Sequence, residues 1–144
     1  MRTTPVLLAL LALSALAMVG CRTQQPDGKE PRAIARAFDE FEQAAPSDRD
    51  AALAALKSTP CTDPADCADR DACVHYASSL QTATNLAAKA KHLGSEDAGG
   101  TGAATPEELA TIVSAADDAV KDADAARQPC LDALDRLHRR AGAK

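Results

Sequence analysis

RDACVHYASSLQTATNLAAKAKHLG, residues 70–94, decides the fold of this chain. Apolar or small residues recur in it at intervals of three and four, which is the spacing of one face of an α-helix. These positions are Cys73, Tyr76, Leu80, Ala83, Ala87 and Ala90. Because most of them are small, the pattern predicts a long helix from about Arg70 to Leu93 that packs closely against another helix. Gly94 then suits the left-handed conformation that often follows a helix end.

The partner helix is expected after a turn of glycines and small residues, 94–104. Thr105 is a capping residue, Pro106 suits the first turn, and Glu108 closes a capping box. An apolar seam continues through Leu109, Val113, Ala116, Val120, Ala123, Cys130, Leu134 and Leu137. The seam keeps its phase across Pro129, so we expect a kink there and no break. Two long helices joined by a short turn should lie antiparallel.

Two shorter helices are expected earlier in the chain. Pro31 suits the first turn of one that ends near Ala45, and its apolar stripe is Ile34, Phe38 and Phe41. Ser47 suits the cap of the next helix, whose large apolar residues are Leu53 and Leu56. Prolines, cysteines and aspartates predict a loop over 58–69. We found no strand pattern, so the predicted fold is all-α, an alanine-rich antiparallel hairpin or small helical bundle.

The first 21 residues form a separate unit. Residues 6–19 are uncharged, a run too short for a bilayer-spanning helix, which needs about 20 residues. A charged start, a short apolar run and small residues before a cut site are typical of a secretory signal. The end of the run, Leu16-Ala17-Met18-Val19-Gly20-Cys21, resembles the lipobox of bacterial lipoproteins, except that Met18 stands where the family more often has leucine.

The resemblance implies that residues 1–20 are a signal peptide and that Cys21 becomes the lipidated N-terminus, carrying diacylglycerol and an amide-linked acyl chain such as palmitate. Two or more chains would anchor the protein firmly to a membrane. Arg22 follows the cysteine where an aspartate would retain a Gram-negative lipoprotein at the inner membrane, so the expected location is the outer membrane, facing the periplasm. Residues 21–30 are polar and are predicted to be a flexible tether to a helical domain over 31–144.

Composition limits what the mature chain can do. From Cys21 onward it has 15 basic and 21 acidic residues, a net charge of −6, which argues against nucleic acid as a partner. Alanine supplies 30 of those 124 residues, and only 17 are valine, isoleucine, leucine, phenylalanine or tyrosine. This predicts a thin core between close helices and no wide apolar pocket, and we expect no cofactor.

The mature chain has four cysteines besides Cys21, which predicts two disulfides in an exported domain. In an antiparallel hairpin Cys73 and Cys130 lie at similar heights, their offsets from the turn differing by about 6 Å. We therefore expect a Cys73–Cys130 disulfide and a small Cys61–Cys67 loop. The rival pairing, Cys67–Cys130 with Cys61–Cys73, fits the heights nearly as well.

Other chemistry has weaker support in the sequence. Cys61, Cys67, Cys73 and His75 have spacings unlike those of structural zinc sites. Asp71 and His75 lie four residues apart on one helix face, but no nucleophile motif accompanies them, so we expect no catalytic residues and no enzyme. The charges of Arg136–Lys144 are expected to complement the helix dipole, with contact to an anionic envelope surface as the alternative.

Lys144 supports a further hypothesis. A lipidated Cys21 with a final lysine is similar to the murein lipoprotein of enteric bacteria, and that resemblance implies attachment of Lys144 to peptidoglycan. The disulfides and the folded-back helices depart from that family's single coiled coil. The sequence therefore predicts a non-enzymatic, lipid-anchored envelope protein with a structural or protein-interaction role. The alternatives are a peptidoglycan-linking lipoprotein and a periplasmic metal- or ligand-binding module.

Overall fold

The computed structural model describes residues 28–94 and 104–142 and places four helices there. They are α1 (Lys29–Gln43), α2 (Arg49–Ser58), α3 (Pro64–Gly94) and α4 (Pro106–Gly142). Within these ranges there is no strand, and the all-α prediction with two disulfides is confirmed. Among the described helices, none is both long enough and apolar enough to cross a membrane.

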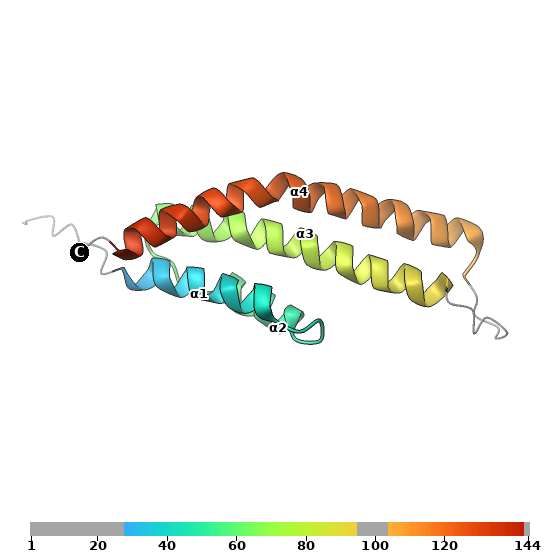
Figure 1. Cartoon of the computed structure of the whole chain (residues 1–144), viewed down its shortest axis with the longest axis horizontal. Helices are drawn as coiled ribbons and strands as arrows, with labels where there is room; N and C mark the ends of the chain where they lie inside the picture. Colours follow the sequence, from blue (N-terminus) through green and yellow to red (C-terminus); the bar gives the residue numbers. More distant parts are fainter. Residues whose placement is uncertain (1–27, 95–103, 143–144) are drawn as a thin grey trace, which may run out of the picture.

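The four helices run alternately in opposite directions (Figure 1). The long helices α3 and α4 lie side by side as an antiparallel hairpin, and the shorter α1 and α2 cover one half of its length. We call the end where α1 and α3 begin and α4 ends the base. The opposite end, where α3 ends and α4 begins, is the tip. The molecule is therefore a four-helix bundle at the base and a two-helix hairpin toward the tip.

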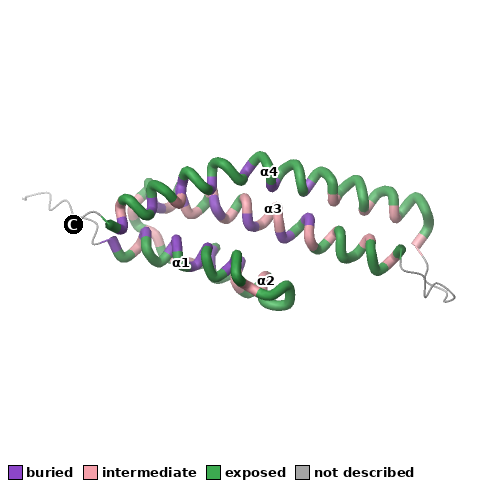
Figure 2. The backbone as a smooth tube through the Cα atoms, viewed as in Figure 1, coloured by how far each residue is buried: buried purple, intermediate pink, exposed green. Residues whose placement is uncertain are grey.

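The core occupies the base half. Phe38 and Phe41 of α1 are each 1% exposed, and Leu56 of α2 and Leu137 of α4 are fully buried. The same cluster also contains Ile34, Leu53, Cys73, Ala77, Cys130 and Ala133. Figure 2 shows buried residues concentrated there and along the facing sides of α3 and α4, with mostly exposed residues near the tip. The apolar stripe predicted for α1 and the two leucines predicted for α2 are confirmed.

The seam of α4 differs from the one predicted. Val113 and Val120 are 44% and 48% exposed, whereas Ala119 is 8% exposed. The buried positions of α4 are Ala119, Ala123, Ala126, Cys130, Ala133, Leu137 and Ala141. Small residues let two helix backbones approach closely, so alanine fills the contact and the branched valines stand beside it. On α3 the prediction also fails in part, because Ala87 is exposed and Gln81 is buried.

The N-termini of α3 and α4 are fixed by side-chain caps. The capping box is confirmed, because the Glu108 backbone N donates to Thr105 Oγ1 at 3.2 Å and the Thr105 N donates to Glu108 Oε2 at 2.8 Å. The helix predicted from Arg70 begins six residues earlier, at Pro64. Its first turn is capped by Asp63, whose Oδ1 accepts a hydrogen bond from the Ala65 N at 2.7 Å. The predicted loop is correspondingly shorter.

Two terminus predictions are wrong. Ser47 does not cap α2, because Asp48 occupies the cap position and the Ser47 hydroxyl donates to its carboxylate. Gly94 belongs to α3 and does not have a left-handed conformation. Pro129, in contrast, lies inside a continuous α4, whose ribbon is bowed in Figure 1. The preserved seam therefore outweighs the helix-breaking tendency of proline.

Candidate functional site

The base of the bundle is where the two ends of the described chain meet. The guanidinium of Arg32 in α1 donates two hydrogen bonds to the carbonyl oxygen of Ala141 in α4, at 3.2 and 2.6 Å. Gly28 caps α1 with a φ of 69°, and a Cβ there would lie 3.1 Å from the same carbonyl oxygen. Glycine is therefore favoured by both conformation and space. Gly28 and the first residues of α1 belong to the packed base, although residues 21–30 were predicted to form a tether.

A buried disulfide joins the two long helices near the base. Cys73 is fully buried and Cys130 is 1% exposed, and their Cα atoms are 4.5 Å apart. We call this bond the staple. It has the pairing expected from axial position, and it lies within the core cluster rather than at its margin. Because it links residues 57 apart in sequence, it restricts the unfolded chain strongly.

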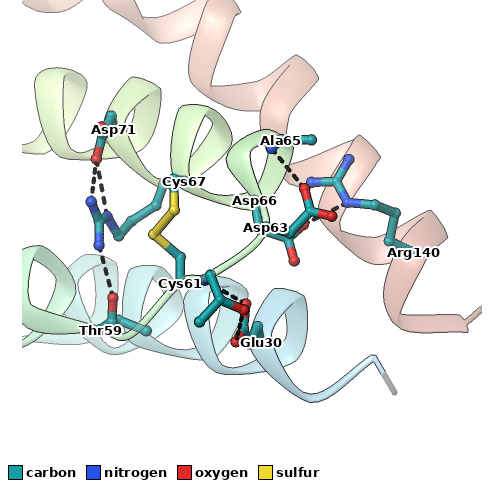
Figure 3. The surroundings of a disulfide bond; sticks show 11 residues. Glu30, Thr59, Cys61, Asp63, Ala65, Asp66, Cys67, Asp71 and Arg140 are labelled. Carbon is teal, nitrogen blue, oxygen red and sulfur yellow. Dashed lines mark hydrogen bonds and ion pairs between the residues drawn. A yellow bond between two sulfur atoms is a disulfide. The ribbon is translucent and has the colours of Figure 1, made fainter. Parts of the chain in front are cut away.

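The second disulfide, Cys61–Cys67, connects the segment before α3 to its first turn; we call it the clip (Figure 3). Both of its cysteines are half-buried. Beside it the backbone N and the hydroxyl of Thr62 donate to the Glu30 carboxylate, each at 2.8 Å. Arg70 reaches back from α3 and donates to the carbonyl oxygen of Thr59 at 3.0 Å. The clip therefore belongs to a set of contacts that hold segment 59–63 against α1 and α3.

Four charged side chains form a network between α3 and α4, which we call the ion-pair cluster: Asp66, Asp69, Arg136 and Arg140. Arg136 donates twice to Asp69 Oδ1, through Nε at 2.9 Å and Nη2 at 2.6 Å. Arg140 donates from Nε to Asp66 Oδ1 at 2.6 Å and from Nη2 to Asp69 Oδ2 at 2.5 Å. One guanidinium therefore bridges two carboxylates, which makes the register of α3 on α4 specific.

The two carboxylates of this network are buried, so they depend on their arginine partners. Asp66 is 1% exposed and Asp69 is 4% exposed, while the arginine side chains are 45% and 27% exposed. Burial by itself would raise the pKa of Asp69, but hydrogen bonds and charge from Arg136 and Arg140 outweigh it and hold that pKa below its ordinary value. A charge buried to this degree is tolerated only when it is paired.

The ion-pair cluster was missed by the sequence analysis, which assigned Asp69 to a loop and interpreted Arg136–Lys144 as helix-end charges. A usable signal was present. Asp66 and Asp69 continue the three- and four-residue spacing that leads to Cys73, and Arg136 and Arg140 lie four residues apart on α4. With Cys73 opposite Cys130, an antiparallel register brings these two pairs to the same height.

The other proposed site residues have varied outcomes. Cys21 and Lys144 lie outside the described residues. Asp71 accepts hydrogen bonds from its neighbour Arg70 at 3.0 and 2.8 Å. The cysteines of the alternative metal site, Cys61, Cys67 and Cys73, are joined in disulfides. Across residues 28–94 and 104–142, no group of three or more histidine, cysteine or acidic side chains is arranged to hold a metal ion.

Comparisons of the chain with protein-family models, curated proteins and solved structures find no significant match.

Proposed function

We propose that this chain is a lipid-anchored protein of the bacterial cell envelope, held at Cys21, with a non-enzymatic structural or protein-interaction role. The lipobox that ends at Cys21 supports the anchor. The orientation is supported by the described chain, which begins and ends at the base, opposite the tip. Cys21 precedes Gly28 by seven residues, which span at most about 25 Å. A lipid on Cys21 therefore keeps the base close to the membrane.

The hairpin then provides the surface for protein interaction. α3 has 31 residues, which corresponds to a length of about 46 Å, and its second half extends beyond the helices that cover the base. The staple and the ion-pair cluster fasten α3 to α4 near the anchored end. In this proposal the tip is presented to a protein of the envelope, and the absence of aspartate after Cys21 favours the outer membrane, facing the periplasm.

The geometry gives less support to a wall link through Lys144. Gly142 ends α4 at the base, directly after Ala141, which lies against Gly28, and Lys144 follows Gly142 by two residues. A bond from Lys144 to peptidoglycan would therefore start from the end that the lipid also holds, whereas a spacer between membrane and wall needs its two attachments at opposite ends.

Lipidation is tested by expressing the full chain in a Gram-negative host with a clickable palmitate analogue and determining the mass of the mature N-terminal peptide. We expect a label on Cys21 and cleavage after Gly20. The Cys21→Ser variant should remain uncleaved and unlabelled, while Cys61→Ser/Cys67→Ser, the matched control, should be processed normally. Labelling of Cys21→Ser, or an unlabelled native chain, would refute the anchor.

The interaction role needs a separate test in the same cells. A photo-crosslinking residue is placed at Glu107 near the tip or at Arg139 near the base, both of which are exposed. We expect a discrete protein adduct from the tip position and lipid or no adduct from the base position. Adducts of equal yield from both positions, or none from either, would contradict a role for the tip.

A further inference from the structure

We propose that the clip is a redox-sensitive device: a dithiol reductant opens Cys61–Cys67 while the staple stays closed, and opening releases α2 from the bundle. The proposal concerns the folded helical domain and does not depend on the lipid anchor. It rests on the different burial of the two disulfides and on the small number of side chains, Leu53 and Leu56, that α2 buries.

The two disulfides differ in access. A thiolate must reach a sulfur atom to attack it, so exposure governs the rate of exchange. The staple is closed to attack because Cys73 is fully buried and Cys130 is 1% exposed. Both cysteines of the clip are half-buried; Cys61 precedes α3 and Cys67 lies near its N-terminal end. A reductant can therefore discriminate between them without unfolding the protein.

The chemistry balances with one dithiol. A thiolate of the reductant attacks a clip sulfur, the S–S bond breaks, and a mixed disulfide forms. The second thiol of the reductant displaces the remaining cysteine, so the reductant leaves as its own disulfide. Two electrons and two protons pass to Cys61 and Cys67, which become thiols.

α2 is the element that responds. It has ten residues and buries two of them, Leu53 and Leu56. A helix this short is marginal without tertiary contacts. Segment 59–63, which fixes its C-terminal end, is held by the clip, by the Thr62–Glu30 hydrogen bonds and by the Arg70–Thr59 hydrogen bond. The Thr62–Glu30 bonds are exposed and compete with water, and the Arg70–Thr59 bond is only partly buried, so we expect the covalent tie to contribute most.

Opening of the clip should stay local. The clip joins residues six apart, whereas the staple and the ion-pair cluster connect α3 to α4 independently of it. Release of α2 would remove Leu53 and Leu56 from the core cluster and uncover apolar side chains of its other members. The reduced form would then present an apolar surface at the base half that the oxidised form conceals.

The first experiment treats the purified mature chain with increasing dithiothreitol and identifies free thiols by alkylation and mass spectrometry. We expect Cys61 and Cys67 to be alkylated at least about tenfold faster than Cys73 and Cys130. Simultaneous reduction of all four cysteines would overturn the proposal.

The second experiment measures amide hydrogen exchange in the oxidised chain, the selectively reduced chain and Cys61→Ser/Cys67→Ser. We expect exchange within α2 to accelerate by at least about tenfold in both clip-free forms, and exchange around Cys130 to stay unchanged. Thr62→Ala, which keeps the clip and removes one hydrogen bond to Glu30, is the matched control and should have a smaller effect. Unchanged α2 exchange in the reduced native chain would overturn the proposal, even if the double variant fails to fold.

Discussion

Arg140 in the last turns of α4 donates a 2.6 Å hydrogen bond to Asp66 in the first turn of α3. Asp66 is only 1% exposed. The contact connects residues 74 apart in sequence and ties α3 to α4 at the base of the hairpin. α3 begins beside the clip, and α4 ends beside α1 at the base.

Removal of Arg140 should destabilise the fold. In Arg140→Ala the Asp66 carboxylate stays buried without this partner. We expect the free energy of unfolding to fall by about 2–3 kcal/mol. This is at the low end of the loss caused by breaking a fully buried ion pair, because the arginine is partly exposed. Urea denaturation followed by circular dichroism measures the change. Arg139→Ala, at an exposed neighbouring position, should change stability by less than about 0.5 kcal/mol. Equal effects of the two substitutions would contradict a structural role for the Arg140–Asp66 pair.

Acid should weaken the domain through Asp69. The folded-state pKa of Asp69 lies below its ordinary value of 3.8. The ionised carboxylate therefore contributes stability that is fully present above that value and is lost as the pH falls through the folded-state pKa. We expect the urea midpoint to decline below about pH 4 in the native chain, and to decline less steeply in Asp69→Asn. Identical acid profiles for the two proteins would exclude Asp69 as the responsible group.

The staple should contribute more stability than the clip. Chain-entropy estimates give about 4 kcal/mol for the loop that Cys73–Cys130 closes and about 2 kcal/mol for the Cys61–Cys67 loop. The double variants Cys73→Ala/Cys130→Ala and Cys61→Ala/Cys67→Ala, compared by urea denaturation, should follow that order. Non-reducing peptide mapping of the native chain checks the pairing directly, and a peptide joining Cys67 to Cys130 would contradict it.

The capping box should stabilise the start of α4. Thr105→Ala removes the hydroxyl that accepts from the Glu108 backbone, and we expect a loss of about 1 kcal/mol. Thr105→Ser, which keeps the hydroxyl, should behave like the native chain. Hydrogen exchange locates the effect, because loss of the cap should accelerate exchange in the first turn of α4 more than exchange at the base. A uniform change along α4 would speak against local capping.

Local signals in the sequence predicted the helical architecture, and axial position predicted the Cys73–Cys130 pairing, but the ion pairs between α3 and α4 were not predicted. The Thr105-Pro106-Glu108 pattern and the stripe of Ile34, Phe38 and Phe41 depend on neighbouring residues, and both are confirmed. The prediction for the seam of α4 was wrong at Val113 and Val120. Small alanine side chains occupy the close contact between the helices, and the larger valines lie exposed beside it.

The ion-pair cluster was harder to predict because its members lie about 70 residues apart, and each pair has an ordinary interpretation within its own segment. Asp66 and Asp69 fall in the loop predicted over 58–69, and Arg136 and Arg140 resemble the basic end of a helix. Their role depends on the register of α3 on α4, which the alanine-rich seam specifies only weakly.

The meeting of both ends of the described chain at the base also determines how the molecule would respond to force. Tension applied between Gly28 and Gly142 would load the contacts of Arg32 with Ala141 first and then the ion-pair cluster, one after another, as in a zipper. The covalent bond between Cys73 and Cys130 would stop that peeling before it reached the second half of the hairpin. The tip is thus mechanically insulated from strain at the base.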